Sequence, residues 1–150
     1  MLTNSNFKEL LSILAANGVK YLIVGGYAVT KYAEPRYTKD LDLWVLANPG
    51  NAQKIYYALR EFGAPLVDIS ADDFAHEGYF YQMGIPPVRV DILMSIPGMT
   101  SFEEAWERRE NVEIDGVVFP FISKQDLIIS KRASGRPQDL LDVRSLEEEM

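Results

Sequence analysis

The apolar positions in the first part of the chain switch between helical and extended spacing. Four of them recur at intervals of three and four residues and predict a helix over 7–16, which Asn17-Gly18 would end: Phe7, Leu10, Leu11 and Leu14. The apolar run over 21–24 predicts a strand that leads directly into Gly25-Gly26, and residues 27–32 fit a short helix. This region therefore predicts a helix, then a strand, a glycine turn and a second helix.

The middle of the chain predicts three more strands and a helix. Residues 40–46 begin with two aspartates and continue as an apolar strand, and 52–62 carries its apolar residues on one helical face. Residues 78–83 and 88–93 fit a hairpin joined by a proline-containing turn. Because side chains alternate along a strand, Arg89 and Asp91 are expected on one face of the second hairpin strand.

The last third of the chain shows short elements with clear capping signals. They are a helix from Ser101 to Arg108, a hairpin over 112–119 around Asp115-Gly116, a helix from Ser123 to about Ser134, and a helix starting at Pro137. The stretch 66–74 fits either a short strand over 67–69 or a helical turn opened by Ser70 or Asp72. Together the elements predict an α/β (α+β) fold, a small mixed sheet flanked by helices, in one domain over 1–150 with short C-terminal helices.

Composition narrows the classes of function. The chain has 150 residues, 22 acidic against 15 basic, a net charge of -7 and no cysteine. Disulfide frameworks, thiolate zinc sites and cysteine nucleophiles are therefore excluded, and the charge disfavours nucleic acid or an anionic membrane as a partner. The absence of cysteine suits a reducing cytoplasm, where we expect the protein, and without an apolar run of about 18 residues we expect no membrane span.

Three carboxylates are placed where a cation would be needed. Asp40 and Asp42 lie two apart on a predicted strand, so both point to one face, and Asp91 lies on a later strand that can pair beside it. Like charges a few ångströms apart repel, and a divalent ion would offset that repulsion. The alternative for the Asp-x-Asp pair taken alone is a solvated strand edge.

The glycine pair Gly25-Gly26 adds a candidate phosphate site. Between a strand and a helix N-terminus, glycines let the backbone approach a ligand closely and present free amide groups to it. The alternative is a tight connection that requires only a positive φ angle. No Gly-Lys-Ser/Thr follows and the spacing is not Gly-x-Gly-x-x-Gly, so neither a P-loop nor a dinucleotide fingerprint is present.

These motifs in this order resemble the nucleotidyltransferase superfamily related to DNA polymerase β. The resemblance covers roughly 20–145 and combines Val24-Gly25-Gly26-Tyr27-Ala28, Asp40-Leu41-Asp42-Leu43 and Arg89-Val90-Asp91-Ile92. Within that superfamily, Arg36-x-Thr38-x-Asp40 is similar to bacterial minimal nucleotidyltransferases, including the toxins of type IV toxin–antitoxin systems. The run Lys131-x-x-x-Gly135-Arg136-x-x-Asp139-x-x-Asp142 resembles their closing helices.

The resemblance implies metal-dependent transfer of a nucleoside monophosphate from a nucleoside triphosphate (NTP) to an acceptor hydroxyl. By analogy, Asp40, Asp42 and Asp91 would hold the metal and form the catalytic set, with Asp91 helping to deprotonate the acceptor. Gly25 and Gly26 would line the triphosphate. The implied cofactor is Mg²⁺ or Mn²⁺, which agrees with a ligand set made of oxygen atoms.

Several other side chains are candidate nucleotide ligands. Arg36, Lys131 and Arg136 could reach a triphosphate, as could Lys39, although Arg36 can instead pair with Asp40 or Asp42, and Arg136 with Asp139. Two aromatic residues that could stack on a base, Tyr27 and Tyr32, more often belong to a core. His76 is expected in an exposed loop rather than as a base.

Two other enzyme classes that use Asp-x-Asp fit less well. In haloacid-dehalogenase-like phosphatases and many glycosyltransferases the motif follows an apolar strand, whereas here a polar segment, 35–39, precedes it. A second hypothesis keeps the fold without catalysis, as a silent nucleotide-binding or toxin–antitoxin component. For an active enzyme, the charge favours a small molecule or a protein over nucleic acid as acceptor, and a homodimer or a partner protein could complete the acceptor site.

Overall fold

The computed structural model describes residues 5–33, 40–84 and 89–148. These residues form helices and strands in the following order: α1 (Ser5–Ala16), β1 (Tyr21–Val24), α2 (Gly25–Tyr32), β2 (Asp40–Val45), α3 (Pro49–Phe62), the 3-10 helix η1 (Ala71–Ala75), β3 (Phe80–Met83), β4 (Arg89–Leu93), α4 (Phe102–Glu107), β5 (Glu110–Ile114), β6 (Val117–Phe121), α5 (Lys124–Ser134) and α6 (Pro137–Glu148). None of the described helices is both long and apolar enough to cross a membrane.

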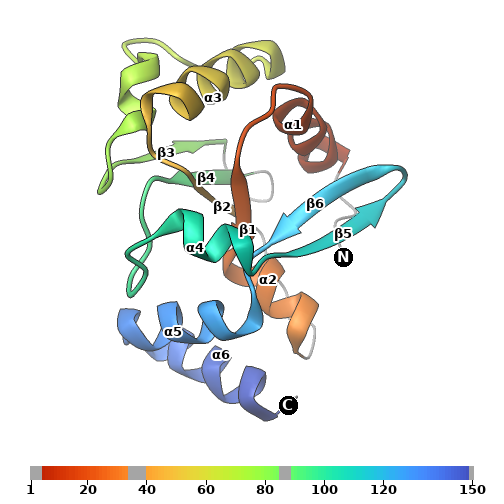
Figure 1. Ribbon diagram of the computed structural model, residues 1–150, viewed down its shortest axis with the longest axis vertical. Helices are drawn as coiled ribbons and strands as arrows, with labels where there is room; N and C mark the ends of the chain where they lie inside the picture. The colour runs from red at the N-terminus through yellow and green to blue at the C-terminus, as the bar shows by residue number, and fades with distance from the viewer. Residues whose placement is uncertain (1–4, 34–39, 85–88, 149–150) are drawn as a thin grey trace.

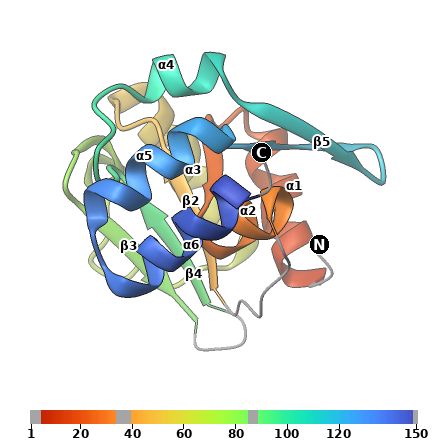
Figure 2. The same ribbon diagram turned by 90° about the horizontal axis from the view of Figure 1, so that it is seen from below.

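The strands form one mixed sheet with the order β3-β4-β2-β1-β6-β5. β1 runs antiparallel to β2 and parallel to β6, and β2 runs parallel to β4. Figure 1 shows α1 and α3 on one side of this sheet and α2, α5 and α6 on the other, and Figure 2 shows α5 and α6 from below. The predicted fold class, a small mixed sheet flanked by helices, is confirmed.

Burial of β1 and capping of α3 follow from residues in and next to these elements. All four residues of β1 are buried, as expected for an apolar strand with a neighbour on each side. Helix α3 starts at Pro49, earlier than predicted, because the Asn48 side chain accepts a hydrogen bond from the Asn51 amide. The buried Asn51 side chain in turn bonds the Lys20 backbone and the Leu46 carbonyl, which ties α3 to β1 and β2.

Two local predictions need correction. The strand considered over 67–69 does not form; the chain turns there, and Ser70 and Asp73 make a reciprocal capping box that opens η1. Gly25-Gly26 is the first turn of α2 rather than a turn that precedes the helix. The helical-turn alternative at Ser70, the hairpins and the remaining helices are confirmed, with ends that shift by a few residues.

Candidate active site

Parallel pairing of β2 with β4 brings the predicted carboxylates together. The register places Asp42 directly opposite Asp91, and Asp40 opposite Arg89. The burial pattern along both strands alternates, so these four residues share one face while Leu41, Leu43, Val90 and Ile92 point into the core. Asp40 and Asp42 thus share a face and Asp91 lies beside them, which is the arrangement the sequence predicted.

Asp42 is electrostatically the most strained member of this cluster. Burial raises its pKa from 3.8 to about 7, with further contributions from the Asp91 charge, a hydrogen bond with Asp91 and the Asp40 charge, while Lys131 acts in the opposite direction. Near pH 7 the structure therefore stabilises a proton or a cation beside Asp42. A carboxyl group perturbed in this way within a cleft is typical of a functional site.

Arg89 is the cation that already contacts this cluster. Its Nε and Nη2 each donate a 3.1 Å hydrogen bond to one oxygen of Asp91, and its Nε lies 3.9 Å from an oxygen of Asp40. Such a two-point contact fixes the plane of the carboxylate as well as neutralising it. Sequence analysis placed Arg89 on this face but gave it no role.

The residues fit a hard divalent cation in part. Among the described residues, Asp40 Oδ1 is buried without a hydrogen-bond partner. Burial and the neighbouring Asp91 and Asp40 charges disfavour the ionised form of Asp42 and raise its pKa, so both residues have oxygens to offer a cation. Within the described ranges, however, no three histidine, cysteine or acidic side chains converge as a ready metal site. Arg89 takes both oxygens of Asp91 in this arrangement.

The first glycine of α2 lies against Asp42. Gly25 has φ +67°, and a Cβ atom built on it would lie 2.1 Å from Asp42 Oδ2. Only glycine therefore fits between the start of α2 and this carboxylate. Within the part of the chain that the structure describes, no side chain caps the N-terminus of α2. The predicted glycine pair is thus beside the predicted carboxylates, and the positive end of α2 faces the same place.

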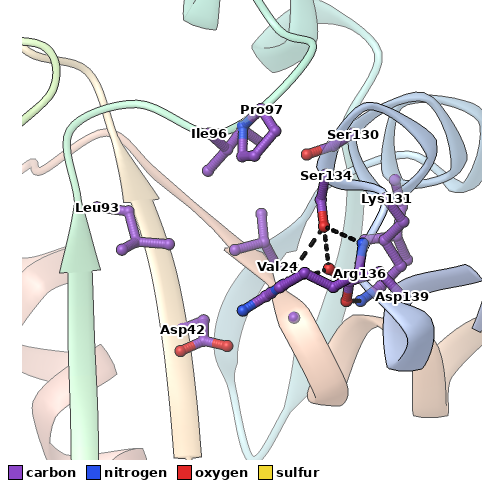
Figure 3. Close-up of a pocket in the computed structure, with 12 residues that line it drawn as sticks. Val24, Asp42, Leu93, Ile96, Pro97, Ser130, Lys131, Ser134, Arg136 and Asp139 are labelled. Carbon is purple, nitrogen blue, oxygen red and sulfur yellow. Dashed lines mark hydrogen bonds and ion pairs between the residues drawn. The ribbon is translucent and has the colours of Figure 1, made fainter.

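A cleft of about 100 Å³ separates Asp42 and Gly25 from helices α5 and α6. Most of its polar lining residues come from α5 and α6, and Asp42 is the charged residue on the strand side. The cleft is lined by Val24, Gly25, Asp42, Leu93, Ile96, Pro97, Leu127, Ser130, Lys131, Ser134, Arg136 and Asp139. Figure 3 shows the two sides, with Asp42 and Leu93 facing Ser130, Ser134 and Arg136 across the opening.

Two of the basic residues predicted as nucleotide ligands, Lys131 and Arg136, line this cleft. Lys131 is buried, and its Nζ lies 3.1 Å from Asp139 Oδ1 and 3.0 Å from Asp142 Oδ2. Arg136 is 78% exposed at the side chain and donates a 2.9 Å hydrogen bond from Nε to Asp139. The pairing of Arg136 with Asp139, considered as an alternative, is therefore present. Ser134 also donates a hydrogen bond to Asp139.

The segment that follows β4 forms the apolar wall and is fixed to α5. A Cβ atom built on Gly98 would lie 2.7 Å from Ala133 Cβ and 3.1 Å from the Ile129 carbonyl oxygen, so backbone and helix are in direct contact. This contact presents Ile96 and Pro97 to the cleft.

Sequence analysis missed Ser130 and Ser134 as lining residues. Their spacing from Lys131 provides a signal, because positions 127, 130, 131 and 134 fall on one face of a helix.

The remaining candidates among the described residues, Tyr27, Tyr32 and His76, contact other residues of the protein. Tyr27 is buried edge-on against Phe7, with ring centres 5.9 Å apart, and the Tyr32 hydroxyl donates to the Ile122 carbonyl at 2.8 Å. Tyr27 therefore belongs to the core, and Tyr32 is half-buried against it. His76 is exposed and pairs with Asp72, as expected for a loop residue. Arg36 and Lys39 lie outside the described residues.

Several solved structures share the whole fold of this chain. The chain is similar to the lincosamide antibiotic adenylyltransferase LnuA, bound to lincomycin (15% identity, TM-score 0.62, covering 99% of this chain and 98% of that one). It is also similar to ANT(2")-Ia in complex with adenylyl-2"-tobramycin (15%, 0.59, 93% and 84%). An antigenic nucleotidyltransferase-like protein from Paracoccidioides brasiliensis is a third (18%, 0.53, 95% and 75%). At these identities the likeness is one of fold.

The amino-acid sequence was also compared with curated proteins and with models of protein families. None of the curated proteins matches the chain. The model of one family, described as "Nucleotidyltransferase of unknown function (DUF6036)", matches residues 5–147 and so includes the carboxylates, the first turn of α2 and the cleft. The chain therefore belongs to this family of nucleotidyltransferases.

Proposed function

We propose that this protein transfers a nucleoside monophosphate from an NTP to a hydroxyl acceptor and depends on a divalent metal ion. Membership of a nucleotidyltransferase family supports nucleotidyl transfer in general. Metal-dependent transfer to a hydroxyl is supported above all by the register of β2 and β4, which sets Asp42 beside Asp91 at the N-terminus of α2.

The nucleotide is proposed to bind in the cleft between Asp42 and α5. The amide groups at Gly25 and Gly26 and the positive end of α2 would receive phosphate oxygens. Lys131 and Arg136 lie on the opposite wall, and Arg36 remains part of the proposed set. Because Lys131 and Arg136 are already held by acidic partners, their positions are fixed before the nucleotide arrives.

In the reaction, the acceptor oxygen forms a bond to the α-phosphorus as the bond from the α-phosphorus to the β-phosphate oxygen breaks. The acceptor proton passes to the Asp91 carboxylate, and pyrophosphate leaves with the electron pair of the broken bond. Asp40, Asp42 and Asp91 would hold Mg²⁺ or Mn²⁺, which neutralises charge on the phosphate oxygens. Arg89 orients the Asp91 carboxylate through its two hydrogen bonds.

Small hydroxyl compounds are the acceptors we propose to test first. Two structures with this fold contain lincomycin or an adenylylated tobramycin. The net charge of -7 also disfavours a polyanionic acceptor. Incubation with each NTP, Mg²⁺, and lincomycin or tobramycin would be followed by pyrophosphate release and by the mass of the acceptor.

A thermal-shift screen tests the proposal directly. Wild type, Asp42→Asn and Asp115→Asn are compared with each NTP, with and without Mg²⁺ or Mn²⁺. Asp115 is an exposed hairpin residue far along the chain from the cluster, so its variant controls for the loss of one charge. A ligand at 100 times its Kd stabilises by about 2.7 kcal/mol, a shift of several degrees.

The expected result is a metal-dependent shift with one NTP in wild type and Asp115→Asn but not in Asp42→Asn. If no NTP shifts any of the three proteins, the chain is a catalytically silent member of its family. If Asp42→Asn retains the metal-dependent shift and transfer, the assignment of the carboxylates is wrong.

A further inference from the structure

The row of residues that contains the two central carboxylates continues to the edge of the sheet. Reading across the paired strands, Val24 of β1 lies opposite Asp42, Asp42 opposite Asp91, and Asp91 opposite Gln82 of the edge strand β3. Gln82 is exposed. It is therefore the neighbour of Asp91 on the side away from Asp42.

An exposed aromatic residue follows on the same face. β3 alternates exposed and buried residues, so Phe80 and Gln82 share the face of Asp91. Phe80 is 66% exposed, although it is paired with Leu93, and Leu93 with Trp44. Trp44 on this face is covered by Phe102 of α4, with ring centres 5.0 Å apart. The apolar surface on this face is thus covered at β2 but open at β3.

The in-line geometry of the proposed transfer indicates what binds at the open surface on β3. In-line displacement requires the attacking and leaving oxygens to lie on opposite sides of the phosphorus atom. The sheet order β3-β4-β2-β1 places the α2 N-terminus, which follows β1, on one side of the carboxylates and β3 on the other. If the triphosphate occupies the α2 and α5 side, the attacking hydroxyl enters from β3.

The charges on this face limit what can bind. Arg89 is the only basic residue among the strands β2, β3 and β4, and both of its contacts go to acidic groups of the cluster. An anionic acceptor would find three aspartates and no free cation within these three strands. An exposed ring and a side-chain amide instead suit an apolar ring face and a hydroxyl or amine group.

We propose that Phe80 and Gln82 form the acceptor subsite of this enzyme and that it takes a ring-bearing alcohol without anionic groups. The ring packs on Phe80, Gln82 hydrogen-bonds a polar group, and the reacting hydroxyl is held at Asp91. The bond changes are those given above for transfer. This inference rests on the proposed function, because it assigns the co-substrate of the same site.

Binding of simple glycosides tests the subsite without knowledge of the natural acceptor. The probes are phenyl β-D-glucopyranoside, its methyl counterpart, which lacks the aromatic ring, and its 6-phosphate, which adds negative charge. Affinities are measured by NMR titration of the full chain with Mg²⁺ and the non-hydrolysable α,β-methylene analogue of the NTP chosen in the thermal screen. Phe80→Ala and Gln82→Ala are compared with Tyr57→Ala, which removes a 47% exposed aromatic ring from α3.

The phenyl glycoside is expected to bind wild type and Tyr57→Ala equally, and Phe80→Ala at least fivefold more weakly. Gln82→Ala should weaken the phenyl and methyl glycosides by the same factor, and the phosphate should bind at least fivefold more weakly than the neutral probe. Absence of phenyl glycoside binding to the analogue-loaded wild type, an unchanged affinity in Phe80→Ala, or a preference for the phosphate would each overturn the subsite.

The analogue itself separates the two proposals. If it binds all variants with unchanged affinity while the glycoside results fail, the subsite is wrong and the proposed function stands. If no nucleotide binds, the proposed function fails, and the same glycoside titration on the nucleotide-free protein decides whether the Phe80 surface binds rings at all.

Discussion

Replacement of Asp42 by asparagine is expected to stabilise the metal-free protein at pH 8. The folded protein holds a proton on Asp42 up to a pKa of about 7, whereas the unfolded chain loses it near 3.8. Between these values the folded state binds more protons than the unfolded state, so the free energy of unfolding falls as the pH rises. Asparagine cannot ionise and still offers an N–H donor to Asp91, so the variant escapes this loss.

The size of the effect follows from the same pKa values. Each pKa unit corresponds to about 1.4 kcal/mol, so a rise from 3.8 to about 7 corresponds to about 4 kcal/mol. The variant and the wild type should therefore have similar stability at pH 4. Their difference should grow through pH 4–7 and reach about 4 kcal/mol at pH 8, or about 10 °C in Tm.

Urea unfolding at several pH values in buffer containing a chelator measures this difference. Asp115→Asn provides the control, because Asp115 is exposed and its replacement should give a small difference at every pH. Added Mg²⁺ with the selected NTP should narrow the gap at pH 8 by stabilising the wild type alone. Equal stability of the wild type and Asp42→Asn at pH 8 would refute the reasoning, since it would mean that the Asp42 charge is already compensated.

Three further substitutions probe the surroundings. Gly25→Ala should lower the free energy of unfolding by about 3 kcal/mol and abolish transfer, because its methyl group would lie 2.1 Å from a carboxylate oxygen of Asp42. The control Gly63→Ala, at a glycine with positive φ and nothing within 4 Å, should lower it by about 1 kcal/mol. Urea unfolding measures both changes. Lys131→Met should cost about 3 kcal/mol in the same assay, because Asp142 and Asp139 lose the buried cation between them and Asp139 keeps only the exposed Arg136 among its described cationic partners. Arg89→Gln should destabilise the protein more at pH 8 than at pH 5, since Asp42, whose pKa is raised to about 7, adds its negative charge to the cluster between these pH values. A loss independent of pH would show that Arg89 acts through packing rather than charge.

The elements of this fold were predictable because their signals are local. Capping residues such as Ser101 and Ser123 define helix starts through bonds to amides three residues away, and the structure contains both bonds. The shared face of Asp40 and Asp42 follows from strand alternation alone. The capping box at Ser70 shows the limit of this approach, since a competing strand pattern could be rejected only after the fold was known.

The details of the site depend on contacts between distant segments. That Asp91 faces Asp42 rather than Asp40 is a matter of register between strands separated by more than forty residues, which no local pattern sets. The same holds for Lys131, whose acidic partners come from the next helix, and for Gly25, whose need to be glycine arises from a side chain on β2.

The contact of Gly98 with α5 has a mechanical consequence. Gly98 follows Asp91 by only seven residues, and its backbone touches Ala133 and Ile129 on the helix that carries Lys131. A displacement of α5 toward Gly98 would therefore push on the segment that follows the strand carrying Asp91. This close contact couples the position of the proposed base to the position of α5, and a side chain larger than hydrogen at position 98 would clash with Ala133 and the Ile129 carbonyl.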